Sequence, residues 1–520
     1  MKNKLTEPHT LFQSSMFSNT PNTRDAILKM LIAKWPQSTK EIFVELKDAG
    51  GFNITYQGVH KILKQLEVEG VVNSKDRKYA LSVEWVRNLR RWSEIAEKSY
   101  AKSKSKEYAE FGVGSSVEKN AFLAGREAAQ KALQKTKLKK EPQLALVFAS
   151  SSYKGEYHEL LKGIKSVVKK APIAGCSSMG GEICNKSLQK SVVVAVICAE
   201  KEVFSAKAVG IPLPADAQAR GIGYFLNRLE AEAGLKHEAP SLGFLFLPGF
   251  SKKNEMKSIA PEFLKEFAAY FHNAFPVLGC LAGDNWSFED NWQFCDEKAL
   301  TNAIVFVGIK TRLKFGAKRA SGYEKASEET YKIKVKGDAI VEMAKITGGK
   351  LVYEPALDAY VQATGVGVKE LKHTIPFFVR ELIAQNKAPP ITRVSDGMNG
   401  FPCFIKEKSI RFDNQFEDGD VIQMLKTTPQ HITASTEYAI LEAAKQAGIA
   451  RPSFALLLSC ASLEAILNAH DINEIESVRK GPLTEMPVFG CYGAGEIGPY
   501  PYPLGSESIA ALVFGNELRE

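Results

Sequence analysis

One short pattern occurs three times in this chain, and that repeat restricts the possible folds more than any other feature. Residues 172–183 read PIAGCSSMGGEI, residues 276–285 read PVLGCLAGDN, and residues 487–501 read PVFGCYGAGEIGPYP. An apolar run precedes each copy, another follows it, and a segment with helical periodicity separates the first run from the pattern. The repeated unit is therefore predicted to be a strand, a helix, a short strand with a glycine turn, and a long strand.

Each residue type in the pattern suits a place in such a unit. Proline starts a strand without loss of a ladder hydrogen bond, glycine lets the backbone approach a neighbour, and cysteine is a small buried side chain. The turn then presents an acidic residue, which is Glu182, Asp284 or Glu496. We expect these acids to be approximately equivalent, although the turns differ in length. Simple turn geometry is the alternative role for every one of these glycines.

Polar clusters recur where the first apolar run meets the helical segment, at residues 150–153, 248–251 and 459–462. In α/β sheets, strand ends that lead into helix N-termini leave a crevice with available N–H groups, which suits a ligand carboxylate. An acid of the turn would suit an ammonium group. The predicted ligand site combines the polar clusters with the glycine turns: Ser150, Ser151, Ser152, Tyr153, Gly175, Cys176, Ser177, Gly181, Glu182, Asp284, Ser459, Cys460, Gly490, Cys491, Tyr492, Gly495 and Glu496.

The first 82 residues have a different character. Helices are predicted to start near residue 20, at Ser38 or Thr39 with Glu41 close behind, and near Thr55. A hairpin with a basic tip follows at residues 71–81. The third helix has a buried stripe (Val59, Ile62, Leu63 and Leu66) and an opposite polar face.

Three helices and a basic hairpin resemble a winged helix-turn-helix domain. The resemblance implies that the third helix enters the major groove of double-stranded DNA and that the wing contacts phosphate. Residues 1–110 hold 19 Lys and Arg against 13 Asp and Glu, so they contribute most of the net charge of +9. A solvated polar face and a protein-binding winged helix remain as alternatives. The residues expected at DNA are Tyr56, Gln57, His60, Lys61, Lys64, Lys75, Arg77 and Lys78.

A long helix is predicted over residues 83–110, as a linker between the two regions. Trp85, Leu89, Trp92 and Ala96 form a narrow apolar stripe, close to a coiled-coil seam. Such a stripe predicts a homodimer, which would match a palindromic DNA site. The stripe could equally pack back on the N-terminal domain.

The composition limits the other functional classes. The eight cysteines form no C-x-x-C pair, which favours reduced, buried thiols over a zinc site or a disulfide framework. The N-terminus lacks the apolar core of a signal peptide, and the longest apolar runs reach about half of a membrane span. We therefore expect a cytoplasmic location, no membrane partner, no metal and no cofactor.

Four stretches together resemble a known family: LALVFASSSY at residues 144–153, PVLGCLAGDNWSF at 276–288, YEPALDAYVQATG at 353–365, and the final Gly-Cys pattern. They resemble the FIST N and FIST C domains of prokaryotic signal-transduction proteins, over about residues 111–514. The resemblance implies a sensory module proposed to bind small ligands such as amino acids. The first pattern has one extra residue, GCSSMGGE. The Ser-Cys motif of the C-terminal half continues as Ala461-Ser462, where the family usually has Gly-Arg.

The expected architecture is a mixed α/β sensory body of repeated strand-helix-strand-strand units, preceded by a winged helix-turn-helix domain and a linker helix. The boundaries expected are 1–82 for the winged helix, 83–110 for the linker, 111–345 for FIST N and 346–520 for FIST C. The favoured function is a one-component transcriptional regulator that senses a small metabolite.

Two other functions remain open from the sequence. One is a signalling scaffold whose FIST body binds protein partners. The other is a thiol-dependent enzyme that pairs Cys176 or Cys491 with a distant histidine. No nucleophile elbow, phosphate loop, H-E-x-x-H or zinc signature occurs in the sequence, so we do not expect catalysis.

Overall fold

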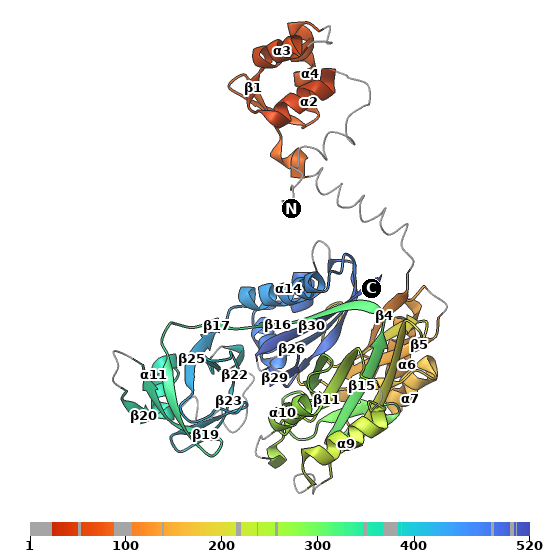
Figure 1. Ribbon diagram of the computed structural model, residues 1–520, viewed down its shortest axis with the longest axis vertical. Helices are drawn as coiled ribbons and strands as arrows, with labels where there is room; N and C mark the ends of the chain where they lie inside the picture. The colour runs from red at the N-terminus through yellow and green to blue at the C-terminus, as the bar shows by residue number, and fades with distance from the viewer. Residues whose placement is uncertain are drawn as a thin grey trace. The chain divides into compact units, whose positions relative to one another are not determined.

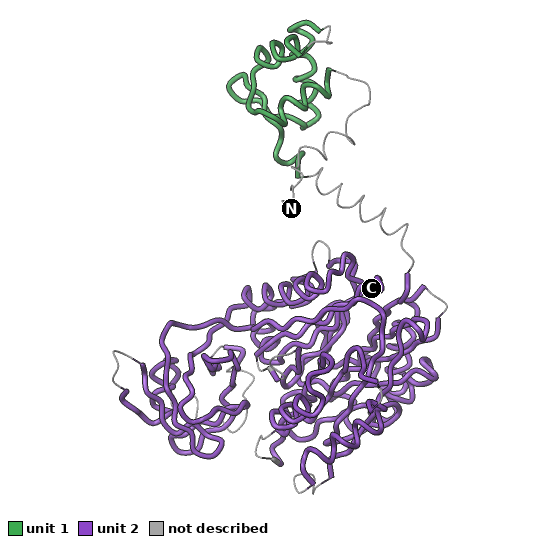
Figure 2. Tube along the Cα trace, viewed as in Figure 1, with its two compact units in different colours: residues 1–106 green, residues 107–520 purple. Residues whose placement is uncertain are grey.

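The chain divides into two compact units, residues 1–106 and residues 107–520 (Figure 2). We refer to the first as the N-terminal unit and to the second as the body. The computed structural model describes residues 23–49, 54–87, 107–137, 140–214, 220–236, 238–254, 258–346, 351–367, 383–385, 387–479, 483–499, 504–505 and 507–519.

Three helices and a small antiparallel sheet form the N-terminal unit. The helices are α2 (Thr23–Ala33), α3 (Thr39–Asp48) and α4 (Tyr56–Val68). The strands pair in the order β1-β3-β2, and they are β1 (Gln37–Ser38), β2 (Val72–Lys75) and β3 (Lys78–Leu81). Apolar residues of all three helices and of the sheet close on a single core.

Side-chain caps start two of these helices at the predicted positions. The Ser38 hydroxyl accepts from the backbone N–H of Glu41 at 3.3 Å, and the Glu41 carboxylate accepts from the N–H of Ser38 at 2.6 Å. Thr55 caps α4 by accepting from the N–H of Gly58 at 3.1 Å. Such caps satisfy N–H groups that have no partner within the helix. The predicted starts of the second and third helices are therefore confirmed, and the start predicted near residue 20 lies outside the described residues.

The body contains three six-stranded sheets. The strands of the first are β4 (Ala109–Ser116), β9 (Val192–Ala199), β5 (Pro142–Ala149), β6 (Ile173–Ser177), β13 (Trp292–Cys295) and β14 (Lys298–Thr301). Those of the second are β10 (Phe204–Pro212), β15 (Ala303–Thr311), β11 (Leu242–Leu247), β12 (Val277–Leu281), β28 (Glu496–Ile497) and β29 (Leu504–Gly505). Those of the third are β16 (Leu313–Ser321), β30 (Ser508–Leu518), β26 (Pro452–Cys460), β27 (Val488–Gly493), β7 (Glu182–Cys184) and β8 (Ser187–Leu188).

Read in that order, the three sheets have the same arrangement of strands. In each sheet an edge strand (β4, β10 or β16) pairs antiparallel with the long strand of a repeat (β9, β15 or β30). Next comes the strand that opens the repeat (β5, β11 or β26), and the Gly-Cys strand (β6, β12 or β27) lies parallel to it. The last two strands of each sheet come from a different repeat. The strands β13 and β14 join the first sheet, β28 and β29 the second, and β7 and β8 the third. The repeats are thus linked in a cycle by exchanged strands.

Inner faces of all three sheets share one core, and the motif cysteines meet within it. The Sγ atoms of Cys176 and Cys280 are 3.5 Å apart, and those of Cys280 and Cys491 are 3.7 Å apart. Figure 1 shows the helices on the outside of the sheets. These helices are α6 (Ala121–Gln134), α7 (Tyr157–Val168), α9 (Ile222–Ala233), α10 (Ala260–Tyr270) and α14 (Pro429–Gln446). Two shorter helices follow β26: α15 (Ala461–Asn468), which is almost wholly buried, and α16 (Glu474–Val478). Short 3₁₀ turns occur at η1 (Ser151–Tyr153) and η2 (Lys252–Asn254).

A small β domain is inserted between β16 and α14, with its own apolar core. It contains the helix α11 (Ala356–Thr364), which packs on its sheet. Its strands are β17 (Glu324–Lys325), β18 (Tyr331–Lys336), β19 (Ala339–Lys345), β20 (Tyr353–Pro355), β21 (Ile391–Arg393), β22 (Asn399–Gly400), β23 (Pro402–Lys406), β24 (Ser409–Phe412) and β25 (Val421–Lys426). The mixed α/β class predicted for the body is confirmed.

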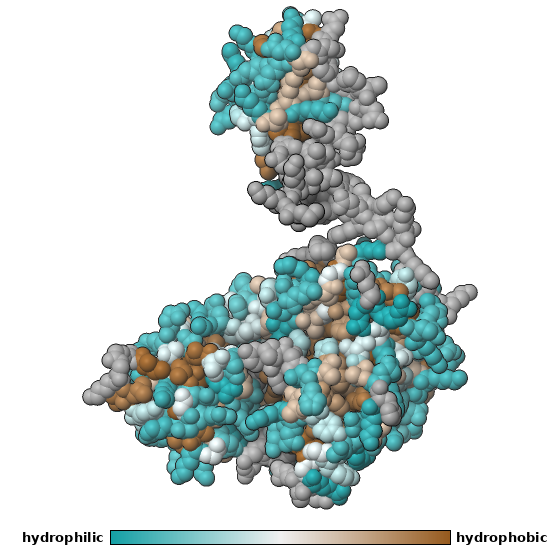
Figure 3. Space-filling view, in the orientation of Figure 1, coloured by the Kyte–Doolittle hydropathy of each residue, from teal (hydrophilic) through white to brown (hydrophobic). Residues whose placement is uncertain are grey.

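Hydrophilic residues cover most of the visible face of each unit, and a group of hydrophobic residues lies over the small β domain (Figure 3). Exposed apolar residues near β19 and β20 include Ile346, Leu351 and Val352. In the described part of the chain, no helix combines the length and the apolar character that a membrane crossing needs.

The three turn acids are not equivalent in the structure, contrary to our expectation. Glu182 lies opposite Cys491, Glu496 lies opposite Cys280, and the residue opposite Cys176 is Gln293. Each of these side chains accepts a hydrogen bond from the backbone N–H at the start of a long strand: Ser191, Ser508 and Ala303 respectively. Asp284 has a different position because the turn of the second repeat is followed by a longer loop before its exchanged strand.

The motif glycines allow a very close backbone approach in each sheet. A Cβ added at Gly175, Gly279 or Gly490 would lie 1.7 Å from the carbonyl oxygen of the neighbouring strand. No side-chain rotation relieves a clash with backbone, so the strands themselves would have to separate. Glycine is required at these positions by contact, in addition to any role in the turn.

We predict that Gly490→Ala destabilises the body by about 3 kcal/mol, at the upper end of the usual cost of overpacking. Thermal unfolding followed by circular dichroism should show a clear fall in Tm. Gly223→Ala is the matched control, because a Cβ added there, near the start of α9, has no heavy atom within 4 Å. A Gly490→Ala protein with the same Tm as the wild type would contradict the close contact between Gly490 and the neighbouring strand.

Candidate functional site

A cavity of about 40 Å³ lies where the three repeats meet the small β domain. That volume is about three times the minimum needed by one water molecule, so the cavity suits a small molecule. Met179 comes from the first repeat, and Phe250, Trp286 and Phe288 come from the second. The third repeat and the small domain complete the lining with Cys460, Ala461, Ser462, Gly493, Ala494, Glu507, Ile383, Phe401 and Asp413.

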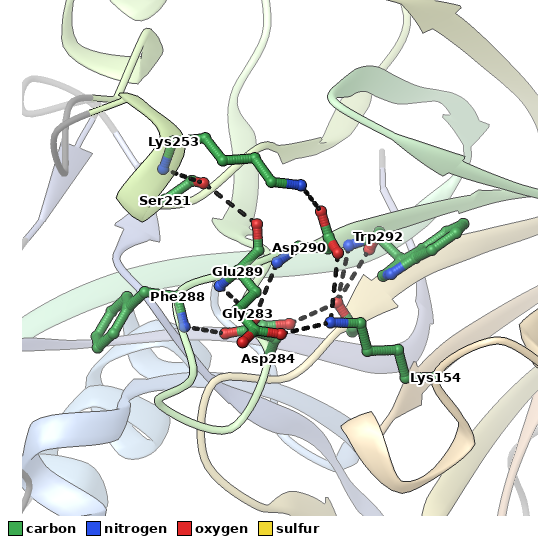
Figure 4. Close-up of polar contacts among 10 residues, drawn as sticks. Lys154, Ser251, Lys253, Gly283, Asp284, Phe288, Glu289, Asp290 and Trp292 are labelled. Atoms are coloured by element: carbon green, nitrogen blue, oxygen red, sulfur yellow. Dashed lines mark hydrogen bonds and ion pairs between the residues drawn. The ribbon is translucent and has the colours of Figure 1, made fainter.

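Asp284 positions the loop that brings two aromatic side chains to the cavity. Its carboxylate accepts from the backbone N–H of Phe288 at 2.7 Å, of Glu289 at 2.7 Å and of Asp290 at 3.0 Å. Figure 4 shows these bonds converging on Asp284. The loop needs such support because Trp286 and Phe288 have left-handed φ angles of 66° and 53°, which are unfavourable for bulky residues.

Ion pairs, drawn in Figure 4, and the hydroxyl of Ser177 fix the same loop. Lys154 contacts Glu289 at 3.1 Å and Asp290 at 3.3 Å, and Lys253 contacts Asp290 at 2.7 Å. The Ser177 hydroxyl donates to the carbonyl of Gly283 at 2.6 Å and accepts from the N–H of Trp292 at 2.9 Å. Both ends of the loop are therefore tied to the first repeat.

Another part of the cavity lining is a compact polar cluster at the start of α15. The Ser462 hydroxyl donates to Glu507 at 2.5 Å, and its oxygen is 3.0 Å from the Cys460 sulfur. The Cys460 sulfur lies 3.7 Å from the Glu507 carboxylate. Glu507 is only 2% exposed, so its carboxyl group faces the cavity and the protein instead of bulk water.

Burial controls the protonation of the acids around the glycine turns. Desolvation raises the pKa of Glu182 to about 8, although hydrogen bonds from Ser178 and Ser191 oppose the shift. Desolvation likewise raises the pKa of Glu507 to about 8, against the hydrogen bond from Ser462. For Glu496, burial and the nearby Glu507 raise the pKa well above its usual range. These carboxyl groups therefore hold protons near neutral pH, where exposed acids are ionised.

The donor of one cavity side chain has no partner. The indole Nε1 of Trp286 is buried and makes no hydrogen bond within the residues that the structure covers. A buried polar group without a partner costs free energy, so such an atom marks a place where a ligand atom would be stabilising.

The predicted ligand residues are not brought together as one site. Cys460 lines the cavity, and Ser459 donates to Glu474 at 3.4 Å just behind it. Tyr492 is buried and bonds Ser187 at 2.5 Å. Gly181 donates its N–H to Glu464 at 3.0 Å, and Gly495 accepts from the N–H of Leu281 at 2.9 Å.

The remaining predicted residues have other neighbours. Ser150 caps the 3₁₀ turn of Ser151, Ser152 and Tyr153, and the Tyr153 hydroxyl donates to the carbonyl of Glu118. Gly175, Cys176, Gly490 and Cys491 pack in the core, while Ser177 and Asp284 hold the loop. Glu182 and Glu496 bond serines at the starts of long strands.

Most cavity residues were missed by reasoning from the sequence. Trp286 and Phe288 directly follow the second Gly-Cys pattern, so their place beside the turn was a usable signal. Glu507 follows the third copy of the pattern, directly before β30, so its place was also a usable signal. Phe401 and Asp413 lie far from every copy along the chain and reach the cavity only through tertiary packing. Within the described residues, no group of three or more His, Cys, Asp or Glu side chains has a metal-binding arrangement.

A second candidate surface lies on the N-terminal unit. All eight residues expected at DNA are exposed, along α4 and on the hairpin of β2 and β3. Lys64 contacts Glu67 at 2.8 Å and lies 5.9 Å from the ring centroid of Tyr79, so it also links the helix to the hairpin. Trp85 packs partly buried against the core of this unit, and Leu89, Trp92 and Ala96 lie outside the described residues.

We predict that the stability of the body falls as pH rises from about 5 to 8. A folded pKa near 8 exceeds the unfolded value of about 4.3, so the folded state binds more protons in this window and loses that advantage as pH increases. Each such group contributes a slope of at most about 1.4 kcal/mol per pH unit. Glu182→Gln should flatten the dependence of Tm on pH, whereas Glu159→Gln, at an exposed position on α7, should not. If Tm depends on pH with the same slope in the wild type and in both variants, the raised pKa of Glu182 is contradicted.

Two domain families match the body, and two solved structures show only weak likeness to it. Residues 143–344 match the FIST N domain, and residues 356–499 match the FIST C domain. A crystal structure of cyanuric acid hydrolase from A. caulinodans is 7% identical over 40% of this chain and 73% of its own, with a TM-score of 0.21. T. maritima PurL complexed with ATP is 10% identical over 78% of this chain and 71% of its own, with a TM-score of 0.18. Neither likeness supports an argument about fold or chemistry.

No curated protein matches the sequence. The two family matches comprise 202 and 144 residues, which together are about two thirds of the chain. Both lie within the body, and both agree with the resemblance drawn from its sequence motifs. The body of this chain thus contains a FIST N domain and a FIST C domain, and these domains point to a sensory role in signal transduction.

Proposed function

We propose that this protein is a one-component regulator, in which the FIST body binds a small metabolite and the N-terminal unit binds double-stranded DNA as a winged helix. The observation that carries the sensory part is the cavity at the junction of three repeats and the small β domain. A ligand there contacts four segments at once, so its binding energy can favour one arrangement of these segments over another. Amino acids are the first class to test, because the family resemblance implies them.

The DNA-binding part is supported by the surface of the N-terminal unit. A three-helix core with an antiparallel hairpin presents α4 with an exposed polar face, next to a hairpin with three exposed basic residues. In winged helix domains, the third helix reads base edges and the wing contacts phosphate. The excess of basic residues before residue 110 supplies the charge that such contacts need.

Binding is favoured over thiol catalysis by the position of the motif cysteines. Cys176 and Cys491 are 0% exposed and contact Cys280 in the core of the three sheets. A nucleophile must reach its substrate, and these sulfurs are enclosed by packed side chains. We therefore assign these cysteines to packing.

We propose a homodimer as the DNA-binding form, based on the apolar pattern of Leu89, Trp92 and Ala96 in the sequence, since Trp85 packs partly on its own unit. The full-length protein should show twice the mass of one chain by light scattering at tens of micromolar. A single-chain mass, with DNA binding intact, would contradict the dimer and leave the rest of the function in place.

We predict that Lys61→Glu combined with Lys75→Glu weakens DNA binding by at least tenfold. One residue lies on the exposed face of α4 and one at the hairpin, and both changes place a negative charge near phosphate. Gel retardation with duplexes selected from a random-sequence pool measures the effect, and wild-type affinity should fall steeply with added salt.

The matched control for this prediction is Lys265→Glu with Lys298→Glu. It makes the same change of net charge at exposed positions on the body. Absence of salt-sensitive DNA binding by the wild type would refute this half of the proposed function, and an equal loss in the control would assign the effect to net charge alone.

A further inference from the structure

The cavity lining has an unusual composition for a site that binds an anion. Four aromatic side chains contribute to it, namely Phe250, Trp286, Phe288 and Phe401, together with the apolar Met179 and Ile383. The charged residues among the described lining are both acids, Glu507 and Asp413, and none is lysine or arginine. A ligand carboxylate would meet two carboxyl groups and no cationic partner from that lining.

Aromatic faces and carboxyl groups favour the same kind of ligand. The face of an aromatic ring is negative, and it attracts a cation within about 6 Å, by as much as about 2 kcal/mol where water is excluded. A carboxylate attracts the same charge, and more strongly in a buried site than in water. Asp413 also accepts from the N–H of Phe401 at 2.6 Å, so it fixes the position of one aromatic wall.

We propose that the cavity binds a small organic cation, such as a primary or quaternary amine, with its charge at Glu507 and its alkyl groups against the aromatic side chains. This inference rests on the sensory function proposed above and specifies the chemistry of the ligand. It concerns the charge of the ligand at this cavity and requires no carboxylate on the ligand, because a neutral oxygen such as a hydroxyl could accept from the Nε1–H of Trp286.

Binding of a cation there is coupled to release of a proton. Glu507 is surrounded by further acidic groups: Glu496 and Asp413, with the Cys460 thiol and the Tyr323 hydroxyl close by. Burial among these groups raises the pKa of Glu507, so its carboxyl group holds a proton at pH 7. A bound cation favours the ionised form. The affinity for a cation that does not itself titrate should therefore rise with pH, by up to tenfold per unit below the pKa of Glu507.

Three probes of similar size separate the charge of the ligand from its shape: tetramethylammonium, tert-butanol and pivalate. Each is titrated into the full-length protein at pH 8, with calorimetry and the shift in Tm as readouts. Tetramethylammonium should bind and raise Tm, and it should bind at least tenfold more tightly than the other two. Between pH 6 and 7.5 its affinity should increase several-fold, with release of a proton seen in buffers of different ionisation enthalpy.

Glu507→Gln is the decisive variant, and Glu182→Gln is its matched control. Both glutamates are buried, both have a pKa raised by desolvation and both bond a serine, but Glu182 is not among the described residues that line the cavity. Glu507→Gln should weaken tetramethylammonium binding at least tenfold and remove its pH dependence, while Glu182→Gln should retain both. Phe401→Leu provides a second test in case Glu507→Gln fails to fold, and it should weaken cation binding several-fold.

The outcomes distinguish this inference from the sensory function. Unchanged binding of tetramethylammonium in Glu507→Gln, or absence of binding to the wild type, overturns the cation site. Tighter binding of pivalate or tert-butanol also overturns it, but leaves a small-ligand sensor in place. A metabolite that alters DNA binding of the full-length protein without occupying this cavity would support the sensory function and reject the cavity as its site.

Discussion

The body of this protein depends on the contact between each Gly-Cys strand and the parallel strand beside it. Gly175, Gly279 and Gly490 lie so close to a neighbouring carbonyl that no side chain fits. The next residue in each strand is a cysteine, and the three cysteines meet in the shared core. The close approach of the strands thus places the turns that follow them near one another, and these turns interlock through backbone hydrogen bonds such as Ala494 to Leu281 and Gly283 to Ser177.

The candidate site is a product of what differs among the repeats. The second repeat has a longer loop after its turn, and Asp284 folds that loop so that Trp286 and Phe288 face the cavity. The third repeat contributes Ser462 and Glu507, and the inserted domain contributes Phe401 and Asp413. The shared architecture supplies the interlocked turns, and the departures from symmetry supply the polar and aromatic lining.

Local features of the fold were predictable from the sequence, and long-range ones were not. Ser38 and Thr55 mark helix starts because a cap bonds an N–H only three residues away. Strand exchange has no local signal, because the pairing of Glu182 with Cys491 joins opposite ends of the body. For that reason Gln293 could not be recognised as the counterpart of Glu182. Asp284 was named instead, because it is the acid at the end of the second glycine turn. The cavity was missed for the same reason: Cys460 was named from its position at a strand end, but Phe401 and Asp413 of the inserted domain reach it through packing.

The cyclic exchange of strands also sets the order in which the body can be completed during synthesis. The first sheet uses no strand beyond Thr301, so all its strands exist when little more than half of the chain has been made. The second sheet waits for β28 and β29, and the third waits for β27 and β30. Until those segments emerge from the ribosome, β12 and β7 have unpaired edges, the kind of surface that recruits strands from other chains. Loss of the last few tens of residues would therefore leave two of the three sheets with unpaired edges, and the shortened chain would be prone to aggregate.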